Sequence, residues 1–489
     1  MNANDGGAVS LAPLRSATGV ALIGATVLAS GATSYNASVV YVAVPAITRH
    51  FHASVIAIQW TLTSYLLAVA ALLLVAGALA DRLGRRRVLA IGLSVMFAAS
   101  ILCASASSIG VLIAGRAILG VGAALVTPTS LALVNGTLRR ADRARGIGIW
   151  AALETLASAV GPYAGGWLVD HQSWRWIFLL NLPFISLALI IVQRVPESSR
   201  DRRRSPDPVG APLAILGLGG IIYALTEGPD AGWSAPRILI ALVVGVAALL
   251  ALIPAERRRR EPMLKLSLFS SRPFDAINIT TVLIYGVLAA ATYLITVTLE
   301  LKLGYSAAQA GAALIPTTAV VFLLSPLSGA LVSRVSARWL MTGGIVLIGG
   351  SQLWLAHVHH GSHYVSAILP PLLLRGVGLG LMVTPLTAAV LAAVGDADLG
   401  EGSAINDAAA RVGGLVAVAL VPALIGVGAG TTLAVALTHG YRHAMIALGG
   451  LCLAGAFVAL LSGSGKTAAA PPAPDIGRPV PAGNEAASA

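Results

Sequence analysis

Charged side chains are scarce in this chain. Asp, Glu, Lys and Arg together make up 11% of its 489 residues, whereas hydrophobic residues make up 57%. Soluble proteins carry about 25% charged residues, and a soluble domain of this size could not cover its surface with so few. The composition therefore excludes a soluble globular protein and predicts an integral membrane protein.

Cysteine is also nearly absent, with two residues in the whole chain. Cys103 and Cys452 lie inside apolar runs far apart in the sequence, so they offer neither a disulfide framework nor metal-ligand spacing. Four histidines fall between residues 357 and 363. A solvated loop is favoured there over a metal or pH-sensing site, and we expect no metal and no cofactor.

Motifs of ATP-driven pumps and of enzymes are missing as well. The chain has no G-x-x-x-x-G-K-[ST] string, and no single loop combines a nucleophile with a base. Aromatic residues make up only 5% of the chain, so an aromatic-lined multidrug cavity is not evident. The sequence predicts a membrane protein that is not an enzyme.

Apolar runs long enough to cross a bilayer fill most of the chain. A span needs about 20 residues, and such runs occur about fourteen times: six, then two after a basic linker, then six more. The run near 210–226 is the shortest, so twelve or thirteen spans is the alternative. We predict an all-α membrane protein divided into a cytoplasmic N-terminal segment (1–16), a six-helix bundle (17–194), a basic linker with two inserted helices and a cytoplasmic loop (195–273), a second six-helix bundle (274–462) and a disordered cytoplasmic tail (463–489).

Positive charges are concentrated in every second loop. The net charge is +12, and arginines cluster near residues 82–87, 139–145, 194–204 and 257–272. Cytoplasmic loops of membrane proteins are enriched in Lys and Arg. The pattern predicts a multi-pass protein of the plasma membrane with both termini in the cytoplasm, and it argues against nucleic acid as a partner.

A dense charged hairpin lies between two apolar runs, at residues 77–89. Glycine permits a tight reversal and close helix approach, and an aspartate near a helix start is favoured by the helix dipole. The pattern G-x-L-a-D-r-x-G-r-r resembles the signature loop between helices 2 and 3 of major facilitator superfamily transporters, which implies a conformational role; an ordinary positive-inside loop is the alternative. Its residues here are Gly77, Asp81, Arg82, Gly84, Arg85 and Arg86.

Arg116 lies inside the fourth apolar run, where an arginine is costly and marks a water-filled cavity or an ion pair. Its surroundings resemble the superfamily motif l-x-x-x-R-x-x-q-G-x-g-a-a, although Leu119 replaces the usual Gln. In the family this arginine is tied to the coupling of protons and substrate. We expect Arg116 to face a central cavity; an arginine that reaches the outer interface is the alternative.

The fifth run carries small residues at four-residue spacing. They share one helix face and allow another helix to approach closely, and a proline among them allows bending. The string resembles the g-x-x-x-G-P-x-x-G-G motif of exporters in the superfamily, which implies export; a tight helix contact without directional meaning is the alternative. Its residues are Ala157, Gly161, Pro162, Gly165 and Gly166.

Further strings extend the resemblance from about residue 17 to 462, at 174–183, 227–233, 261–269 and 402–414. Together they resemble the fourteen-helix drug:proton antiporter family. The resemblance implies the major facilitator fold, with two six-helix bundles plus two inserted helices, and drug or antibiotic efflux. Weak echoes of the hairpin at 329–338 and of Arg116 at Arg375 agree with two related halves.

The first apolar run departs from the family pattern l-D-x-T-i-V-n-V-A-l-P. Asn36 stands where the family has a membrane aspartate, and an amide cannot take up and release a proton near neutral pH. Glu154, well inside the fifth run, is the leading substitute, with Arg116 as its expected partner. Glu300, Asp407 and Asp275 are weaker candidates because they lie near the ends of their runs. We expect Asn36 to face the central cavity.

These features predict a secondary transporter that exports an amphipathic organic compound, such as a drug, an antibiotic or a metabolite, by proton antiport. Its expected partners are a small organic substrate, protons and the lipid bilayer, and a monomer is expected. Two alternatives stay open. One is a metabolite uptake permease or uniporter without proton coupling, favoured by the missing aspartate. The other is a non-transporting membrane sensor that keeps the fold.

Overall fold

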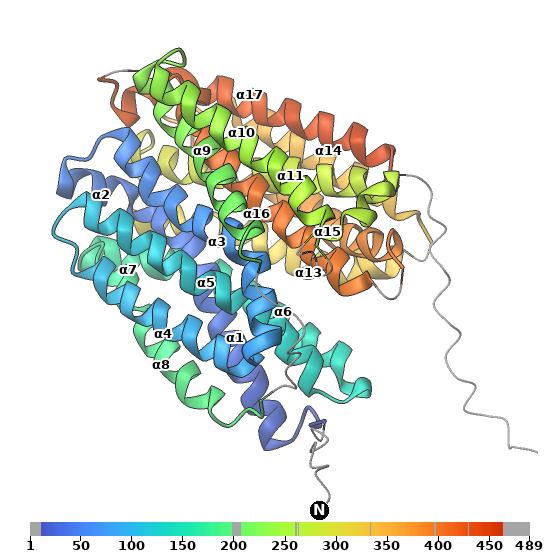
Figure 1. Cartoon of the computed structure of the whole chain (residues 1–489). Helices are drawn as coiled ribbons and strands as arrows, with labels where there is room; N and C mark the ends of the chain where they lie inside the picture. The colour runs from blue at the N-terminus through green and yellow to red at the C-terminus, as the bar shows by residue number, and fades with distance from the viewer. Residues whose placement is uncertain are drawn as a thin grey trace, which may run out of the picture.

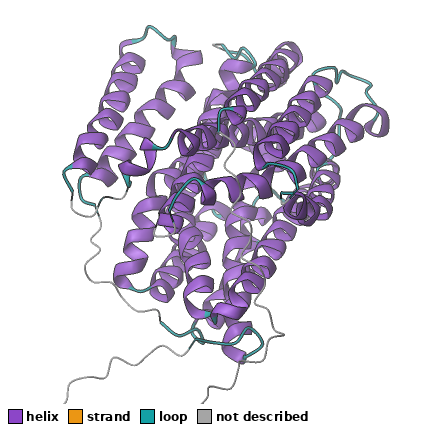
Figure 2. Cartoon of the chain, turned by 90° about the vertical axis from the view of Figure 1, so that its right-hand side faces the viewer, coloured by secondary structure: helices purple, strands orange, loops and turns teal. Residues whose placement is uncertain are grey.

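The computed structural model describes residues 11–197, 207–259, 262, 264–332, 334–395, 398–428 and 430–462. The predicted tail and most of the predicted N-terminal segment lie outside these residues. Within them the chain forms helices, joined by loops, and a single isolated β-bridge between Ala12 and Leu138; Figure 2 draws no strand. The all-helical prediction is confirmed.

The first group of helices runs from residue 17 to 192 (Figure 1). In chain order it comprises α1 (Ala17–Ser38), η1 (Val39–Ala43), α2 (Val44–Phe51), α3 (Val55–Leu83), α4 (Arg85–Ala104), α5 (Ile109–Thr137), α6 (Arg140–His171), α7 (Trp176–Leu179) and α8 (Asn181–Val192). Helix α5 packs against α3 and α4, and α1 packs against α6, α8 and α5. These contacts make one bundle.

The second group follows a helical pair. That pair is α9 (Gly210–Ala231) and α10 (Pro236–Arg257); the group itself comprises η2 (Leu266–Ser270), α11 (Arg272–Leu301), α12 (Ala307–Ala313), α13 (Ile315–Leu331), α14 (Ala337–Leu355), η3 (Tyr364–Ile368), α15 (Leu369–Ala392), α16 (Leu399–Leu424) and α17 (Leu433–Leu460). Helix α15 packs against α13 and α14, whereas α11 packs against α16 and α17.

Among the residues that the structure describes, eleven helical segments are long and apolar enough to cross a membrane. Three of the predicted runs fall outside this set: α6 and α14 are helical over them, and the apolar helix Trp176–Val192 is shorter. Fourteen spans is therefore an approximate count. Helix starts follow local chemistry, because the side chains of Ser16, Ser54, Ser108 and Thr432 each accept a backbone N–H in the first turn.

Two faces can be distinguished along the helix axes. The hairpin face is the end where α3 meets α4 at Gly84, and the opposite face is the end where α2 stops at Phe51. The two bundles contact each other along α3 and α16, along α6 and α12, and between η1 and α11. In Figure 1 the first and second groups lie together near α2 and α3 and diverge toward the start of α6.

We call the contact surface between the two bundles the seam. The helical pair α9–α10 packs on it through α9. Helix α9 packs against both α3 and α16, and its Leu218 and Ile222 share an apolar cluster with Ala71 of α3 and Leu415 of α16. Near the opposite face, Trp60 Nε1 donates to Glu227 Oε1 at 2.8 Å. Helix α9 therefore contacts both bundles at once, whereas α10 packs on α9 and on η2.

Candidate functional site

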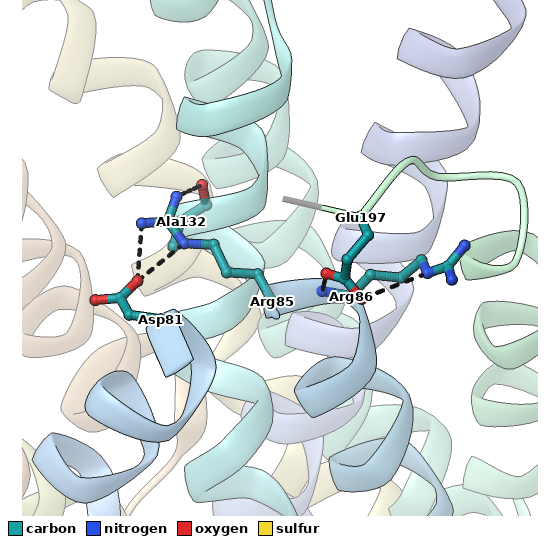
Figure 3. A network of polar contacts seen from close by, with 5 residues as sticks. All are labelled: Asp81, Arg85, Arg86, Ala132 and Glu197. Atoms are coloured by element: carbon teal, nitrogen blue, oxygen red, sulfur yellow. Dashed lines mark hydrogen bonds and ion pairs between the residues drawn. The ribbon is translucent and has the colours of Figure 1, made fainter. Parts of the chain in front are cut away.

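The charged hairpin folds into a polar network at the junction of α3 and α4 (Figure 3). Asp81 Oδ1 accepts from Arg85 Nε at 3.2 Å and from Arg85 Nη2 at 3.0 Å. Arg85 Nη1 also donates to the carbonyl of Ala132 on α5 at 2.9 Å. Arg85 thus ties the end of α3 to the neighbouring helix.

Glu197, which the sequence did not single out, completes this network. Its carboxylate accepts from the backbone N–H of Arg86 at 3.0 Å and of Arg87 at 3.3 Å, so it caps the start of α4 (Figure 3). Gly84 has φ +103°, and a Cβ there would lie 2.6 Å from the Glu197 carboxyl carbon. A side chain at position 84 would be strained by this backbone conformation and would displace the Glu197 carboxylate.

The other two hairpin residues have few neighbours in this conformation. A Cβ at Gly77 would meet no atom within 4 Å, and Arg82 is exposed. The close helix approach predicted at Gly77 is not present, because the bundles diverge toward this face.

Arg116 of α5 is buried inside the first bundle, with 1% of its surface exposed. Its Nε donates to the carbonyl of Thr61 on α3 at 3.1 Å, and its Nη1 donates to the carbonyl of Asn36 on α1 at 3.0 Å. The guanidinium also lies 4.4 Å from the ring centroid of Tyr65. The expectation that Arg116 faces a central cavity is therefore wrong, since its donors are used to join α1, α3 and α5.

Arg375 repeats this arrangement in the second bundle. It is buried in α15, and its Nη2 donates to the carbonyl of Leu288 at 3.0 Å and to Thr292 Oγ1 at 2.7 Å. Both acceptors lie on α11, the first helix of the second bundle, just as Asn36 lies on the first helix of the first. The weak sequence echo thus corresponds to an equivalent contact.

Asn36 is completely buried between α1 and α8. Its Oδ1 accepts from Asn181 Nδ2 at 2.8 Å, and its Nδ2 donates to the carbonyl of Ala32 at 2.8 Å. The expectation that it faces a central cavity is wrong. A neutral amide pair occupies the place where the sequence resemblance predicts an aspartate.

Glu154 lies on the seam between the bundles and has a different partner from the one expected. Its Oε1 accepts from Ser34 Oγ of α1 at 2.7 Å, and Arg411 and Asp407 of α16 act on it electrostatically. Arg411 and Asp407 form an ion pair at 3.5 Å, with 29% and 44% of their side chains exposed. The pairing of Glu154 with Arg116 is corrected: Arg411, from the other bundle, is the cation near Glu154.

The glycine stripe of α6 separates into two faces. A Cβ at Gly161 would lie 2.8 Å from Tyr35, and one at Gly165 would lie 2.2 Å from Val39, so this face packs on α1 and η1. Ala157 follows on the same face, against Gly31. On the other face, a Cβ at Gly166 would lie 2.3 Å from the carbonyl oxygen of Ala307.

The seam is closed on the opposite face. Asp170, at the end of α6, accepts from the backbone N–H groups of Ala307 and Ala308 at 3.0 and 2.9 Å. The rings of Tyr41 in η1 and Tyr293 in α11 lie 5.5 Å apart. Both contacts join one bundle to the other.

Glu300 lies at this closure and not near Glu154. It lines a cavity of about 240 Å³ together with Arg49 and Asp170. Asp275 lies in the first turn of α11, toward the hairpin face. The candidate carboxylates therefore divide among three places, and only Glu154 and Asp407 are brought together.

Lys265, just before η2, forms a charged contact with the segment that precedes α16. Lys265 forms an ion pair with Asp398, just before α16, and a hydrogen bond to that carboxylate raises the pKa of Lys265. This contact lies outside the spanning helices and fixes the loop before α11.

Several known proteins with similar sequences are named as multidrug or antibiotic resistance proteins. The chain is 35% identical over 405 residues to Multidrug resistance protein Stp of Mycobacterium tuberculosis, covering 81% of this chain and 74% of that protein. It is 32% identical to Methylenomycin A resistance protein of Bacillus subtilis, covering 84% and 88%, and 32% identical to Puromycin resistance protein pur8 of Streptomyces alboniger, covering 82% and 80%.

Solved structures share the fold. A peptide transporter of the POT type in complex with sulfate superposes with a TM-score of 0.69 at 14% identity, covering 92% of this chain and 96% of that one. The family model described as Major Facilitator Superfamily matches residues 26–418. The chain is a multi-pass transporter with the major facilitator fold, and it belongs to the major facilitator superfamily.

Proposed function

We propose that this transporter exports an amphipathic organic compound across the plasma membrane in exchange for protons. The names of the resistance proteins support a drug or antibiotic as the exported compound, and the exporter-type glycine string on α6 supports export over uptake. The hairpin face, which is rich in arginine, is the cytoplasmic face in this proposal.

The observation that carries the proposal is the charged group formed by Glu154, Arg411 and Asp407. It combines carboxylates from α6 and α16, one helix from each bundle, with Arg411, which forms an ion pair with Asp407 and acts electrostatically on Glu154. Solvent reaches Arg411 and Asp407, so protons have access to the group. Intramembrane carboxylates of this kind are typical of proton relays.

The charge state of Glu154 can control how the two bundles approach. When Glu154 is ionised, it attracts Arg411 across the seam; when it is protonated, that attraction is lost and Arg411 is left to Asp407. A proton taken up on one face and released on the other would then change the stability of one conformation relative to the other. Asn36 has no part in this step.

In the proposed transport cycle, the space between the bundles opens in turn at the hairpin face and at the opposite face. The present conformation is closed at Asp170 and α12, which we assign to the extracellular side. The open surroundings of Gly77 leave room for another helix in the alternate conformation, when the hairpin face closes. We therefore propose that the hairpin network holds α3 and α4 together while the two bundles come into contact at the hairpin face and separate again.

The proposed organisation keeps the predicted division of the chain. Two halves (17–194 and 274–462) carry the equivalent arginines, and the region 195–273 supplies the pair α9–α10, which spans the seam. Both termini lie in the cytoplasm, and one chain forms the complete pathway.

The test is transport by purified protein in proteoliposomes with an imposed pH gradient. Wild-type protein should move a substrate, such as ethidium or puromycin, against its gradient, and a protonophore should stop it. Glu154→Gln should abolish proton-driven transport while keeping substrate binding. Asp230→Asn, which removes an exposed carboxylate at the end of α9, is the matched control and should transport normally.

Two results would contradict the proposal. Transport by Glu154→Gln at the wild-type rate would remove Glu154 from coupling and make Asp407 the next candidate. Downhill transport by the wild type that ignores the pH gradient would favour a uniporter.

A further inference from the structure

A cavity of about 670 Å³ lies at the hairpin face, away from the seam between the bundles. Its walls are the segment before α1, the start of α4, the connection between α5 and α6, and the segment after α8. All four belong to the first bundle. Arg86 of the hairpin network lines one side of the cavity, whereas its other lining residues take no part in the contacts described above for transport.

Three arginines from three of these elements line the cavity: Arg86, Arg139 and Arg194. Arg86 Nη1 donates to the carbonyl of Val195 at 3.2 Å, and Arg139 Nε donates to the carbonyl of Leu11 at 3.2 Å. Each guanidinium has five N–H donors, so these bonds hold the two side chains in place and leave further donors to bind a ligand.

The carboxylates near the cavity offset the positive charge of the three arginines only in part. Glu197 forms an ion pair with Arg86 at 3.8 Å, and its oxygens also accept from the backbone at the start of α4. Asp142 accepts from the backbone N–H of Leu14. The N-terminus of α1, at Ser16, also borders the cavity and adds a positive dipole end.

Apolar surface lies next to this basic cavity, one to two turns deeper along the flanking helices. Val20 of α1 is 63% exposed, and Leu187 and Ile190 of α8 are 47% and 62% exposed. Helices α1 and α8 pack against each other. A ligand with an anionic headgroup and an apolar tail could contact both the basic cavity and the apolar surface of α1 and α8. A free anion would contact only the cavity.

We propose that the cavity binds the phosphate headgroup of an anionic lipid from the cytoplasmic leaflet, with its acyl chains along α1 and α8. The assignment to that leaflet rests on the proposed orientation, whereas the binding itself does not. Basic pockets between membrane helices on the cytoplasmic side are suited to such headgroups, and guanidinium groups bind phosphate oxygens with two parallel hydrogen bonds.

The experiment measures lipid binding to the purified full chain by native mass spectrometry. Phosphatidylglycerol is titrated against phosphatidylcholine of the same acyl composition. Wild-type protein should prefer phosphatidylglycerol, and the double variant Arg139→Gln/Arg194→Gln should bind it about 30-fold more weakly, because each arginine near an anionic lipid contributes about fivefold.

Two controls separate charge at the cavity from other effects. Arg237→Gln/Arg442→Gln removes the same charge from exposed positions toward the opposite face and should keep wild-type binding. Arg139→Lys/Arg194→Lys keeps the charge and should recover most of the affinity, which a general loss of folding would not allow.

Three results would overturn the proposal. The first is equal binding of the two lipids by the wild type, and the second is unchanged binding by the glutamine double variant. The third is displacement of phosphatidylglycerol by glycerol 3-phosphate at equal concentration, which would make the site one for a free phosphate. None of these depends on proton-driven transport, so the lipid site and the proposed function can fail separately.

Discussion

The contact between Gly166 and α12 gives a quantitative test of the closed seam. An alanine Cβ at position 166 would lie 2.3 Å from the carbonyl oxygen of Ala307, where an ordinary contact begins at 3.4 Å. The difference is about 1 Å, and backbone atoms of a helix cannot rotate away as a side chain can, so α12 must move by that amount. Forcing one extra carbon into a packed contact costs about 1–3 kcal/mol.

This cost applies to one conformation only. In the alternate state α6 and α12 separate at this face, and the added methyl group has space. Gly166→Ala should therefore shift the equilibrium toward the state open on the opposite face by about 5- to 150-fold, since about 1.4 kcal/mol corresponds to a factor of ten. Transport should fall because the closed state is needed in each cycle.

Spin labels at Gln172 and Val435, which are exposed at this face on different bundles, would report the change by pulsed electron resonance. The native cysteines, Cys103 and Cys452, are buried and should not be labelled. Gly148→Ala is the matched control, because it makes the same change in the same helix where no atom lies within 4 Å. Identical distance distributions for both variants would refute the argument.

Three further variants test contacts elsewhere in the molecule. Gly84→Ala places a Cβ at φ +103° against Glu197, so transport should fall. The amount of protein in the membrane, measured by immunoblot, should change little. Full transport activity would mean that the hairpin only sets the membrane topology. Glu227→Ala removes the hydrogen-bond acceptor of Trp60 and should lower the free energy of unfolding by about 1 kcal/mol, seen as a lower midpoint temperature in thermal unfolding. Glu227→Gln should restore the midpoint. An unchanged midpoint in Glu227→Ala would show that α9 is held by apolar packing alone. Arg116→Lys leaves a buried carbonyl unpaired, at about 1–3 kcal/mol, and should reduce the monodisperse yield after detergent extraction; a normal yield with lost coupling would contradict its structural role.

The helices were predictable because each depends on local sequence. Apolar runs of bilayer length and serine or threonine just before a helix act within one or two turns, and the structure follows them closely. The spacing of four also places Ala157, Gly161 and Gly165 of α6 on one face, which packs on α1 and η1, whereas Gly166 lies on another face against Ala307. The partner of that face, α1, could not be read from α6 alone.

The polar contacts were less predictable because their partners are far apart in the chain. Glu197 follows the last helix of its bundle by a few residues and looks like part of a basic linker. Asp170 sits at a helix end, where a charge is ordinary. Arg411 occurs in a string that supports the family resemblance, yet only the three-dimensional arrangement of the two bundles shows that it acts electrostatically on Glu154.

The geometry also explains how this chain can carry an amide at position 36. A buried charge that contacts only its own bundle has the same neighbours in both conformations, so moving the bundles cannot change its affinity for a proton. Arg116 is such a charge, since its hydrogen bonds to the carbonyls of Thr61 and Asn36 stay within the first bundle. The neutral amide pair of Asn36 and Asn181 also lies inside that bundle. Glu154 and Arg411 belong to different bundles, and their separation must change when the seam opens. In the proposed mechanism, proton coupling therefore uses an acid on the seam and needs none at position 36.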